Sequence, residues 1–223
     1  MRGHIIVIEG CDGVGKETQS KLLQKHLEEH GIHSIVRSFP SYNQPQAGPV
    51  EEYLHGKLGN ITDISSQQIS VLFLVDMFVS YKLEKWDEIL DSGTWIIMDR
   101  YVESNIIYQA SKCETLDEAM SIIRYITYAG YGVFGLPKPS AVVYLDVSKD
   151  TSSKLMNARG NATDIHESND EYMTKVHNFG LKIANMLEWE VITCDNEDHT
   201  FIKEKRDIHL DILSHLMSKI NYS

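Results

Sequence analysis

The sequence has 223 residues, of which 24% are charged and 42% are hydrophobic, a balance typical of one globular domain. Its 21 lysine and arginine residues face 32 aspartate and glutamate residues, and the formal net charge of -11 argues against nucleic-acid binding through a broad basic surface. Three scattered cysteines are too few for a disulfide framework or a zinc cluster, and the first apolar run is too short for a secretory signal or a membrane helix. We therefore expect a single domain over residues 1–223, cytoplasmic, with neither a nucleic acid nor a membrane as partner.

Five short apolar runs, rich in β-branched residues, predict strands that are buried on both faces. In chain order these runs are Ile5–Ile8, Ser34–Val36, Trp95–Met98, Ala141–Leu145 and Glu190–Thr193. Longer segments of helical character separate them, and a repeated alternation of strand and helix predicts a parallel sheet with helices on both sides. The expected fold class is therefore α/β, with a central parallel sheet of about five strands.

The helical segments also carry boundary signals. Gly31 follows the first one and is a candidate for the residue that ends it. The segment from about Ile64 to Leu90 is apolar nearly all round, which predicts one long buried helix with Asp63 as its N-cap. The polar stretch from about residue 159 to residue 170 is short enough to be a mobile lid.

A glycine-rich turn directly follows the first predicted strand and has the spacing of a phosphate-binding P-loop. Its residues are Gly10, Cys11, Asp12, Gly13, Val14, Gly15, Lys16, Glu17 and Thr18. Glycines let successive backbone N–H groups turn toward one anion, the following helix presents its positive N-terminus, and the lysine supplies a movable charge. The usual serine or threonine of such loops is replaced by Glu17, which we expect either to meet Mg²⁺ or to face outward while Thr18 contacts phosphate.

A second polar pair ends the third predicted strand, where Asp99 precedes Arg100. Ligands of open α/β sheets bind at the carboxyl ends of the strands, so this pair should lie beside the P-loop. Asp99 is suited to orient Mg²⁺ through water, and the fork of Arg100 is suited to grip a phosphate group.

Together these features resemble the thymidylate kinase family over almost the whole chain, from Ile5 to about Asp195. The motifs that carry the resemblance are the P-loop with Asp12, Phe39-Pro40-Ser41-Tyr42, Leu72-Phe73, Asp99-Arg100-Tyr101 with Ser104-Asn105 and Tyr108-Gln109, Pro137-Lys138-Pro139, and Ala158-Arg159-Gly160 with Asp164 and Glu167. The resemblance implies the three-layer P-loop NTPase fold. It also implies transfer of a phosphoryl group from ATP to dTMP in the presence of Mg²⁺, by a homodimer.

The family's functional residues can be carried over position by position. The implied catalytic residues are Lys16, Arg100, Arg159 and Asp99. The implied ATP-binding residues are Gly10, Gly13, Val14, Gly15, Lys16, Glu17, Thr18 and Arg159. The implied acceptor-binding residues are Asp12, Tyr42, Phe73, Arg100, Asn105, Tyr108 and Gln109. The metal would be held by Asp99, through water, and by Glu17.

Four departures from the family pattern limit what can be carried over. Met77 stands where members usually have a base-binding arginine, and Glu17 replaces the P-loop hydroxyl. The P-loop carries no arginine of its own at Gly13 or Val14, where some members have one, and Arg159 is the only arginine of the lid segment. Met77 motivates a kinase of another deoxypyrimidine monophosphate, dUMP or dCMP. Glu17 and the sparse lid motivate a nucleotide-binding regulatory protein without transfer activity.

Overall fold

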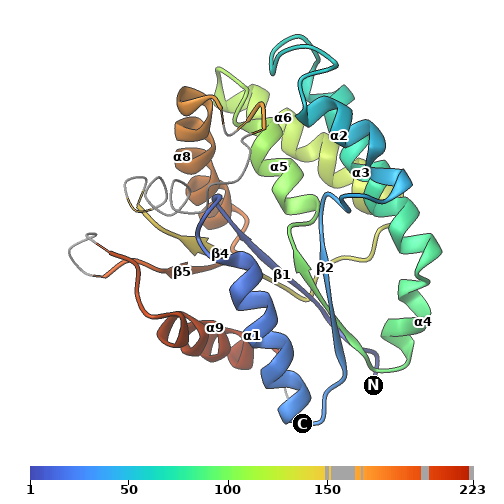
Figure 1. The fold of residues 1–223 in the computed structure, drawn as a ribbon, viewed down its shortest axis with the longest axis vertical. Coiled ribbons are helices and arrows are strands. Elements are labelled where there is room, and N and C mark those ends of the chain that lie inside the picture. Colours follow the sequence, from blue (N-terminus) through green and yellow to red (C-terminus); the bar gives the residue numbers. More distant parts are fainter. Residues whose placement is uncertain (149–150, 152–163, 167, 197–200, 221–223) are drawn as a thin grey trace.

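The computed structural model describes residues 1–148, 151, 164–166, 168–196 and 201–220. One sheet forms its centre, with parallel strands in the order β2-β3-β1-β4-β5 (Figure 1). The strands are β1 (Ile5–Gly10), β2 (Ser34–Ser38), β3 (Trp95–Asp99), β4 (Ala141–Asp146) and β5 (Glu190–Thr193). Each of the five predicted apolar runs is a strand, and the predicted α/β fold with a parallel sheet is confirmed.

The two strands that carry the predicted site are the most deeply buried. All six residues of β1 and all five residues of β3 are buried, because β1 lies between β3 and β4 and helices cover both faces of the sheet. Their register pairs Ile8 with Asp99. The P-loop, which follows Gly10, and the Asp99–Arg100 pair therefore leave the same edge of the sheet side by side.

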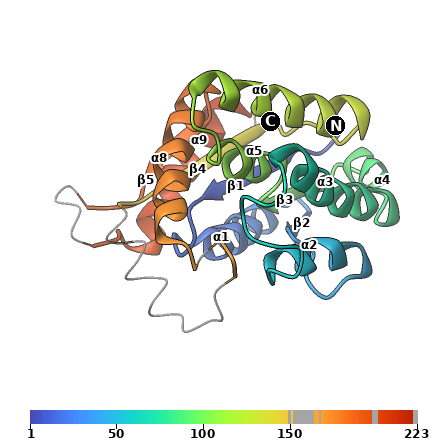
Figure 2. The ribbon, with the colours of Figure 1, turned by 90° about the horizontal axis from the view of Figure 1, so that it is seen from above.

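Helices form the two outer layers. They are α1 (Lys16–Glu29), α2 (Gly48–Leu54), α3 (Ser66–Leu83), α4 (Trp86–Asp91), α5 (Val102–Ala110), α6 (Leu116–Thr127), α8 (Asp170–Met186) and α9 (Lys205–Lys219), with short turns of helix at Pro45–Ala47 and Tyr128–Val133. Helices α1 and α9 enclose one apolar core with one face of the sheet, and α3, α5, α6 and α8 enclose a second core on the other face. Seen from above, α5 lies beside α6 and α2 lies beside α3 (Figure 2).

The predicted end of the first helix is confirmed. Helix α1 stops at Glu29, and Gly31 has a φ of 77°, which a residue with a side chain rarely adopts. The amide of Ile32 then donates to the carbonyl of Leu27, closing the helix end.

The predicted long helix from Ile64 to Leu90 is wrong at both ends. Helix α3 begins after Ser65, which forms a capping box with Gln68, while Asp63 instead accepts a hydrogen bond from the amide of Asn60. The helix ends at Leu83, and Lys85 has a φ of 56°, so the chain turns and starts the separate helix α4. Apolarity alone indicated one buried segment but could not reveal this break.

The predicted lid is only partly within the described residues. Arg159 and Glu167 lie outside them, whereas Asp164, Ile165 and His166 are described, and the amide of Ile165 donates to the carbonyl of Leu54 at 3.0 Å. Residue 170, the predicted end of the lid, is already the first residue of α8. The segment before α8 is thus tied to the end of α2.

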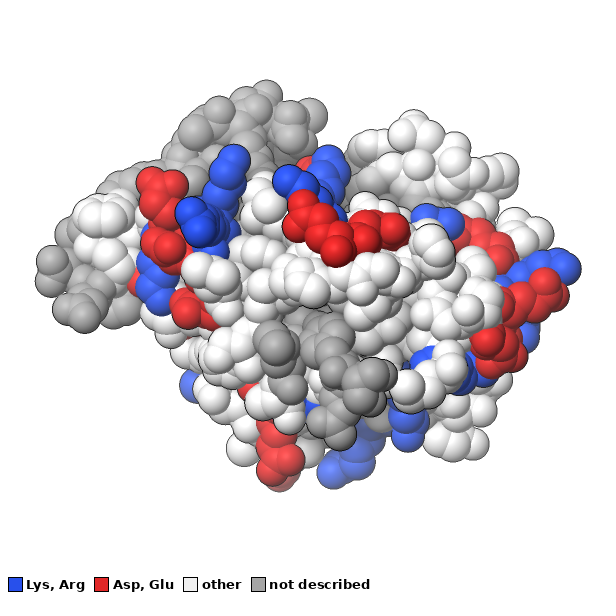
Figure 3. Space-filling model, turned by 90° about the horizontal axis from the view of Figure 1, so that it is seen from below, with Lys and Arg blue, Asp and Glu red and all other residues white. Residues whose placement is uncertain are grey.

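The surface charges and the helices of the described residues relate to two predicted absences, a nucleic-acid partner and a membrane partner. On the face shown in Figure 3, the acidic and basic side chains of the described residues form small mixed clusters separated by uncharged surface. None of the helices in the described part of the chain is both long enough and apolar enough to span a bilayer.

Candidate active site

A pocket of about 260 Å³ lies where β1 and β3 end. It is lined by Asp12, Gly13, Gly15, Lys16, Glu17, Ser38, Phe39, Pro40, Tyr42, Leu54, Phe73, Met77, Asp99, Arg100, Tyr101, Ser104, Asn105, Tyr108, Gln109, Asp164 and His166. The structure therefore brings together most of the predicted site residues. Gly10, Val14 and Thr18 belong to the same loop but do not line the pocket, and Arg159 lies outside the described residues.

The conformation of the P-loop depends on its glycines. Gly10, Gly13 and Gly15 have φ values of 140°, 84° and 94°. A Cβ atom on Gly10 would also lie 2.6 Å from the backbone oxygen of Leu145 on the neighbouring strand. Both the backbone conformation and the close approach of β4 therefore require glycine at this position.

Lys16 is held inside the loop. Its Nζ atom donates to the carbonyl oxygens of Gly10 at 2.9 Å and Cys11 at 2.8 Å, and the residue is 7% exposed. Burial, followed by the positive charge of Arg100, lowers the pKa of Lys16. The carboxylate of Asp12 lies 3.7 Å from the same Nζ atom, and a phosphate group in the pocket would add a second anionic partner.

Arg100 and Asp12 form the floor of the pocket although they come from different loops. Arg100 is ion-paired with Asp12 and donates to the hydroxyl of Ser104 at 2.9 Å, while the hydroxyl of Tyr108 donates to the other oxygen of Asp12 at 2.8 Å. Burial favours the neutral acid, but the charges of Arg100 and Lys16 outweigh it and hold the pKa of Asp12 well below its usual range. The site therefore contains a fixed carboxylate and a fixed guanidinium group.

The backbone at Arg100 is held in an unusual conformation. Its φ of 69° lies in the left-handed region, and its amide donates to the carbonyl of Ile8 on β1 at 3.3 Å. Such conformations persist where the surrounding structure enforces them, and they concentrate at functional sites. Here the conformation places the guanidinium group next to the P-loop.

Buried amide groups and apolar side chains line another part of the pocket. The amide nitrogen of Asn105 donates to the carbonyl of Ser70 at 3.0 Å, which leaves its buried oxygen atom without a hydrogen-bond partner. Gln109 is fully buried, and neither end of its amide has a hydrogen-bond partner. Buried polar atoms are nearly always hydrogen-bonded, so these amides are suited to bind a polar ligand that enters the pocket.

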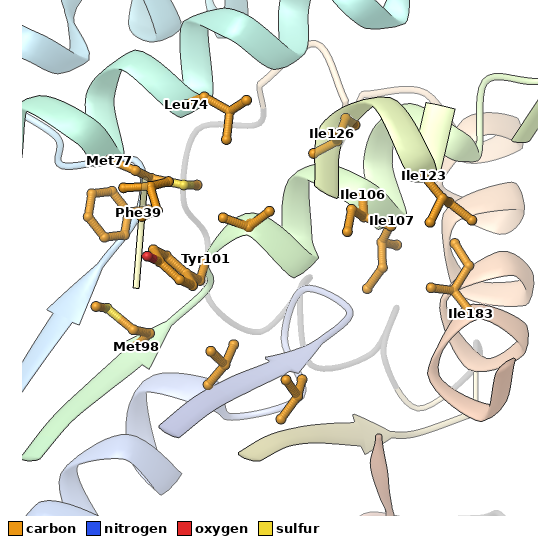
Figure 4. Packing of buried hydrophobic residues seen from close by; sticks show 14 of the residues in the cluster. Phe39, Leu74, Met77, Met98, Tyr101, Ile106, Ile107, Ile123, Ile126 and Ile183 are labelled. Atoms are coloured by element: carbon orange, nitrogen blue, oxygen red, sulfur yellow. The ribbon is translucent and has the colours of Figure 1, made fainter. Parts of the chain in front are cut away.

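Met77 is one of the apolar side chains that line the pocket. It is 2% exposed and belongs to the same apolar core as Phe39 and Tyr101, beside which it lies in Figure 4. Its side chain cannot donate a hydrogen bond, so this position contributes only shape and apolar contact to the pocket.

The candidate metal-binding side chains differ in burial. Asp99 is 8% exposed, and burial raises its pKa against the opposing charges of Lys16 and Arg100. Glu17 is largely exposed and pairs with Lys21 at 2.5 Å, as expected for the outward-facing alternative, although it also reaches the pocket rim. Among the described residues, no three His, Cys, Asp or Glu side chains form a group that could hold a metal ion.

Two residues at or near the pocket were missed by sequence reasoning. Asp76 does not line the pocket, but it accepts hydrogen bonds from the amide and hydroxyl of Ser41 and so ties the loop that carries Tyr42 to helix α3. His166 lines the pocket and contacts Tyr108. Nothing local marked either residue, because an aspartate on an apolar helix and a histidine in a polar segment gain their roles only from packing.

The chain is similar to known proteins over most of its length. A family model described as thymidylate kinase matches residues 8–205. A probable thymidylate kinase of Methanococcus aeolicus is 30% identical to this chain, covering 96% of each protein. A probable thymidylate kinase of Pyrococcus abyssi is 29% identical, covering 84% of this chain and 86% of the relative.

The fold is shared with a solved structure. Thymidylate kinase from Candida albicans superimposes with a TM-score of 0.72, covering 97% of this chain and 92% of the other, at 23% sequence identity. At this identity the likeness concerns the fold. It supports the three-layer P-loop architecture derived above.

Proposed function

Because the chain belongs to the thymidylate kinase family, we propose that it transfers the γ-phosphoryl group of ATP to dTMP and so forms ADP and dTDP. One observation carries the choice of reaction: the Arg100–Asp12 pair and Lys16 meet in the same pocket as a set of buried amides. Cations would hold two phosphate groups while the amides and apolar side chains hold a base. The comparisons favour neither dUMP or dCMP as acceptor nor a regulatory protein without transfer activity.

The acceptor nucleotide would lie between Arg100 and the amides. Arg100 would exchange part of its pairing with Asp12 for the acceptor phosphate, since a guanidinium fork matches phosphate oxygens. Asp12 would then accept a hydrogen bond from a sugar hydroxyl. Tyr42 and Phe73, which both line the pocket, would contact the nucleotide from the opposite wall, with Phe73 against the base.

The buried amides support a thymine base. The amide nitrogen of Asn105 is committed to Ser70, so its oxygen is suited to accept the N3–H of thymine, a proton that cytosine lacks. Gln109 can donate to or accept from the same edge of the base. The apolar surface at Met77 supports a base that carries a methyl group. Because Met77 cannot hydrogen-bond the base, the amides of Asn105 and Gln109 would form the hydrogen bonds to it.

The donor phosphates would bind along the P-loop. The backbone amides of residues 13–18 and the N-terminus of α1 favour an anion there, and Lys16 would turn from the loop carbonyls to the transferred phosphoryl group. Arg159 remains our candidate for a further cation near the donor. Phosphoryl transfer offers the protein little covalent chemistry, so these residues would act by positioning and by neutralising charge.

Mg²⁺ would supply charge neutralisation on the ATP phosphates when it is bound. Asp99, buried beside Lys16 at the end of β3, would orient the ion through water. Glu17 would add a second carboxylate after release from Lys21.

We also propose a homodimer in a reducing, cytoplasmic compartment. Half-buried apolar residues along α3, among them Val71, Val75 and Val79, support a second copy packed on this helix. The three cysteines are free thiols, which supports a reducing compartment. Sedimentation at micromolar concentration tests the dimer, and a purely monomeric protein would contradict it.

A coupled ADP-release assay tests the reaction. With ATP and Mg²⁺ we expect turnover with dTMP and much slower turnover with dUMP, dCMP and dGMP, and no turnover after chelation of Mg²⁺. Equal rates with dCMP and dTMP would contradict the role of Asn105. Tight ATP binding without ADP release for any monophosphate would overturn the proposed reaction.

A further inference from the structure

His166 lies in a box of three tyrosine rings from three helices. Its ring stacks on Tyr108 of α5 with a centroid distance of 5.3 Å and an interplanar angle of 22°. The rings of Tyr53 on α2 and Tyr172 on α8 meet it edge-on at 5.4 and 5.2 Å. At 4% exposure it is buried, yet it lines the pocket.

The hydrogen bonds around Tyr53 favour one protonation state of His166. Lys112 Nζ donates to the Tyr53 hydroxyl at 3.0 Å. The hydroxyl keeps its own proton available for Nε2 of His166, which lies 2.8 Å away. With Nε2 as acceptor, the neutral ring carries its proton on Nδ1.

A charged imidazole is strongly disfavoured in this box. Burial, followed by the positive charge of Lys112, lowers the pKa of His166 to about 3. The negative charge of Asp12 opposes this shift, and the positive charge of Arg100 adds to it. Asp164 lies next to the ring along the chain and accepts a hydrogen bond from the amide of His166 at 2.8 Å.

The stacked ring of Tyr108 links His166 to the acceptor site. The Tyr108 hydroxyl donates to Asp12 at 2.8 Å, and the guanidinium group of Arg100 lies over the same ring at 5.4 Å. A displacement of Tyr108 would therefore move the carboxylate and the guanidinium group that the acceptor needs. The ring of Tyr108 also contacts two other rings, since it stacks on His166 and meets Tyr172 edge-on at 6.4 Å.

We propose that His166, held as a neutral ring by Tyr53 and Lys112, is a positioning residue that places Tyr108 and through it Asp12 for the acceptor nucleotide. The inference rests on the proposed function for the identity of the acceptor. It assigns no direct contact between His166 and the reacting atoms.

A double-mutant cycle tests the link. We expect His166→Ala to raise the calorimetric Kd and the KM for dTMP about 10-fold, with kcat and the KM for ATP within about twofold of wild type. In a Tyr108→Phe background, which has no hydroxyl for Asp12, the same change should raise the Kd less than about twofold. Equal effects in both backgrounds, or equal increases for dTMP and ATP, would overturn the proposal.

Two further measurements separate positioning from folding. His177→Ala is a matched control, because that half-buried histidine contacts the carbonyl of Val147 and does not line the pocket, and it should leave the Kd for dTMP unchanged. Nitrogen-15 NMR should show that Nε2 of His166 is unprotonated in the wild type. In Tyr53→Phe the chemical shift of Nε2 should change, because the hydrogen bond from the Tyr53 hydroxyl is lost. A protonated Nε2 in the wild type would overturn the assignment.

The outcomes distinguish this proposal from the proposed function. If dTMP binds but is not turned over, the proposed kinase reaction is refuted, while the double-mutant cycle can still be measured by calorimetry. If a folded His166→Ala variant turns over dTMP normally and its Kd for dTMP is unchanged, the positioning role is refuted, while the proposed kinase reaction still stands.

Discussion

Substitution of Arg100 by alanine tests the centre of the proposed site most directly. In the free protein Arg100 pairs with Asp12 and donates to Ser104, and in the complex it would form two charge-assisted bonds to the acceptor phosphate. Hydrogen bonds to charged groups contribute about 1.5–3 kcal/mol each. Loss of two such bonds corresponds to a decrease of about 10²–10⁴-fold in kcat/KM for dTMP.

The same substitution also affects folding. It leaves Lys16, at 3.7 Å, as the cation nearest to Asp12 among the described residues, and it removes the guanidinium group that lies over the Tyr108 ring. Breaking a fully buried ion pair costs about 3–5 kcal/mol of stability. Arg100 and Asp12 are 16% and 21% exposed, so we expect a smaller loss, and thermal unfolding is followed in parallel. Arg100→Lys keeps a positive charge without the fork and should refold the site, yet still lose most of the activity.

Steady-state kinetics and calorimetry separate the two effects. ATP binding should stay within about threefold of wild type in each folded Arg100 variant, since the P-loop itself is intact. Arg37→Ala is the control, because Arg37 pairs with Glu84 away from the pocket. A folded Arg100→Ala protein with wild-type kcat/KM for dTMP would refute the reasoning.

Three further predictions concern the loop and pH. Gly10→Ala should abolish ATP binding in calorimetry while the protein still folds, because the new Cβ meets the Leu145 carbonyl at 2.6 Å; unchanged ATP affinity would contradict this. Burial raises the pKa of Glu9 from 4.5 to about 7, so its contribution to stability is complete below pH 4.5 and is lost as pH rises toward 7. Urea unfolding should therefore show a weaker decline over that range in Glu9→Gln, and an identical decline would exclude Glu9 as its source. Burial also lowers the pKa of His26 and His209, whose rings lie 5.8 Å apart, so the contribution of this pair is present above pH 6.5 and is lost as pH falls below it. His26→Gln should be less acid-sensitive than wild type in the same assay, and equal sensitivity would remove the pair as the cause.

Local patterns in the sequence predicted much of the fold. The five apolar β-branched runs predicted the strands, because residues buried on both faces of a parallel sheet must be apolar at successive positions. Gly31 predicted the end of the first helix, since few other residues adopt its φ. The P-loop spacing also marked Gly10, Gly13 and Gly15, and each of them has a positive φ, which glycine adopts most readily.

Tertiary packing decided the rest of the site. The ion pair of Asp12 and Arg100 joins residues 88 positions apart, and the contact of Tyr53 with His166 joins residues 113 apart. Such contacts depend on how helices and loops meet above the sheet, and no local pattern contains that information. The orientation of Glu17 differs from these cases, because its contact with Lys21 is an i,i+4 pair on the exposed side of α1 and depends on helical spacing alone. Packing above the sheet, by contrast, decided which distant side chains share the pocket.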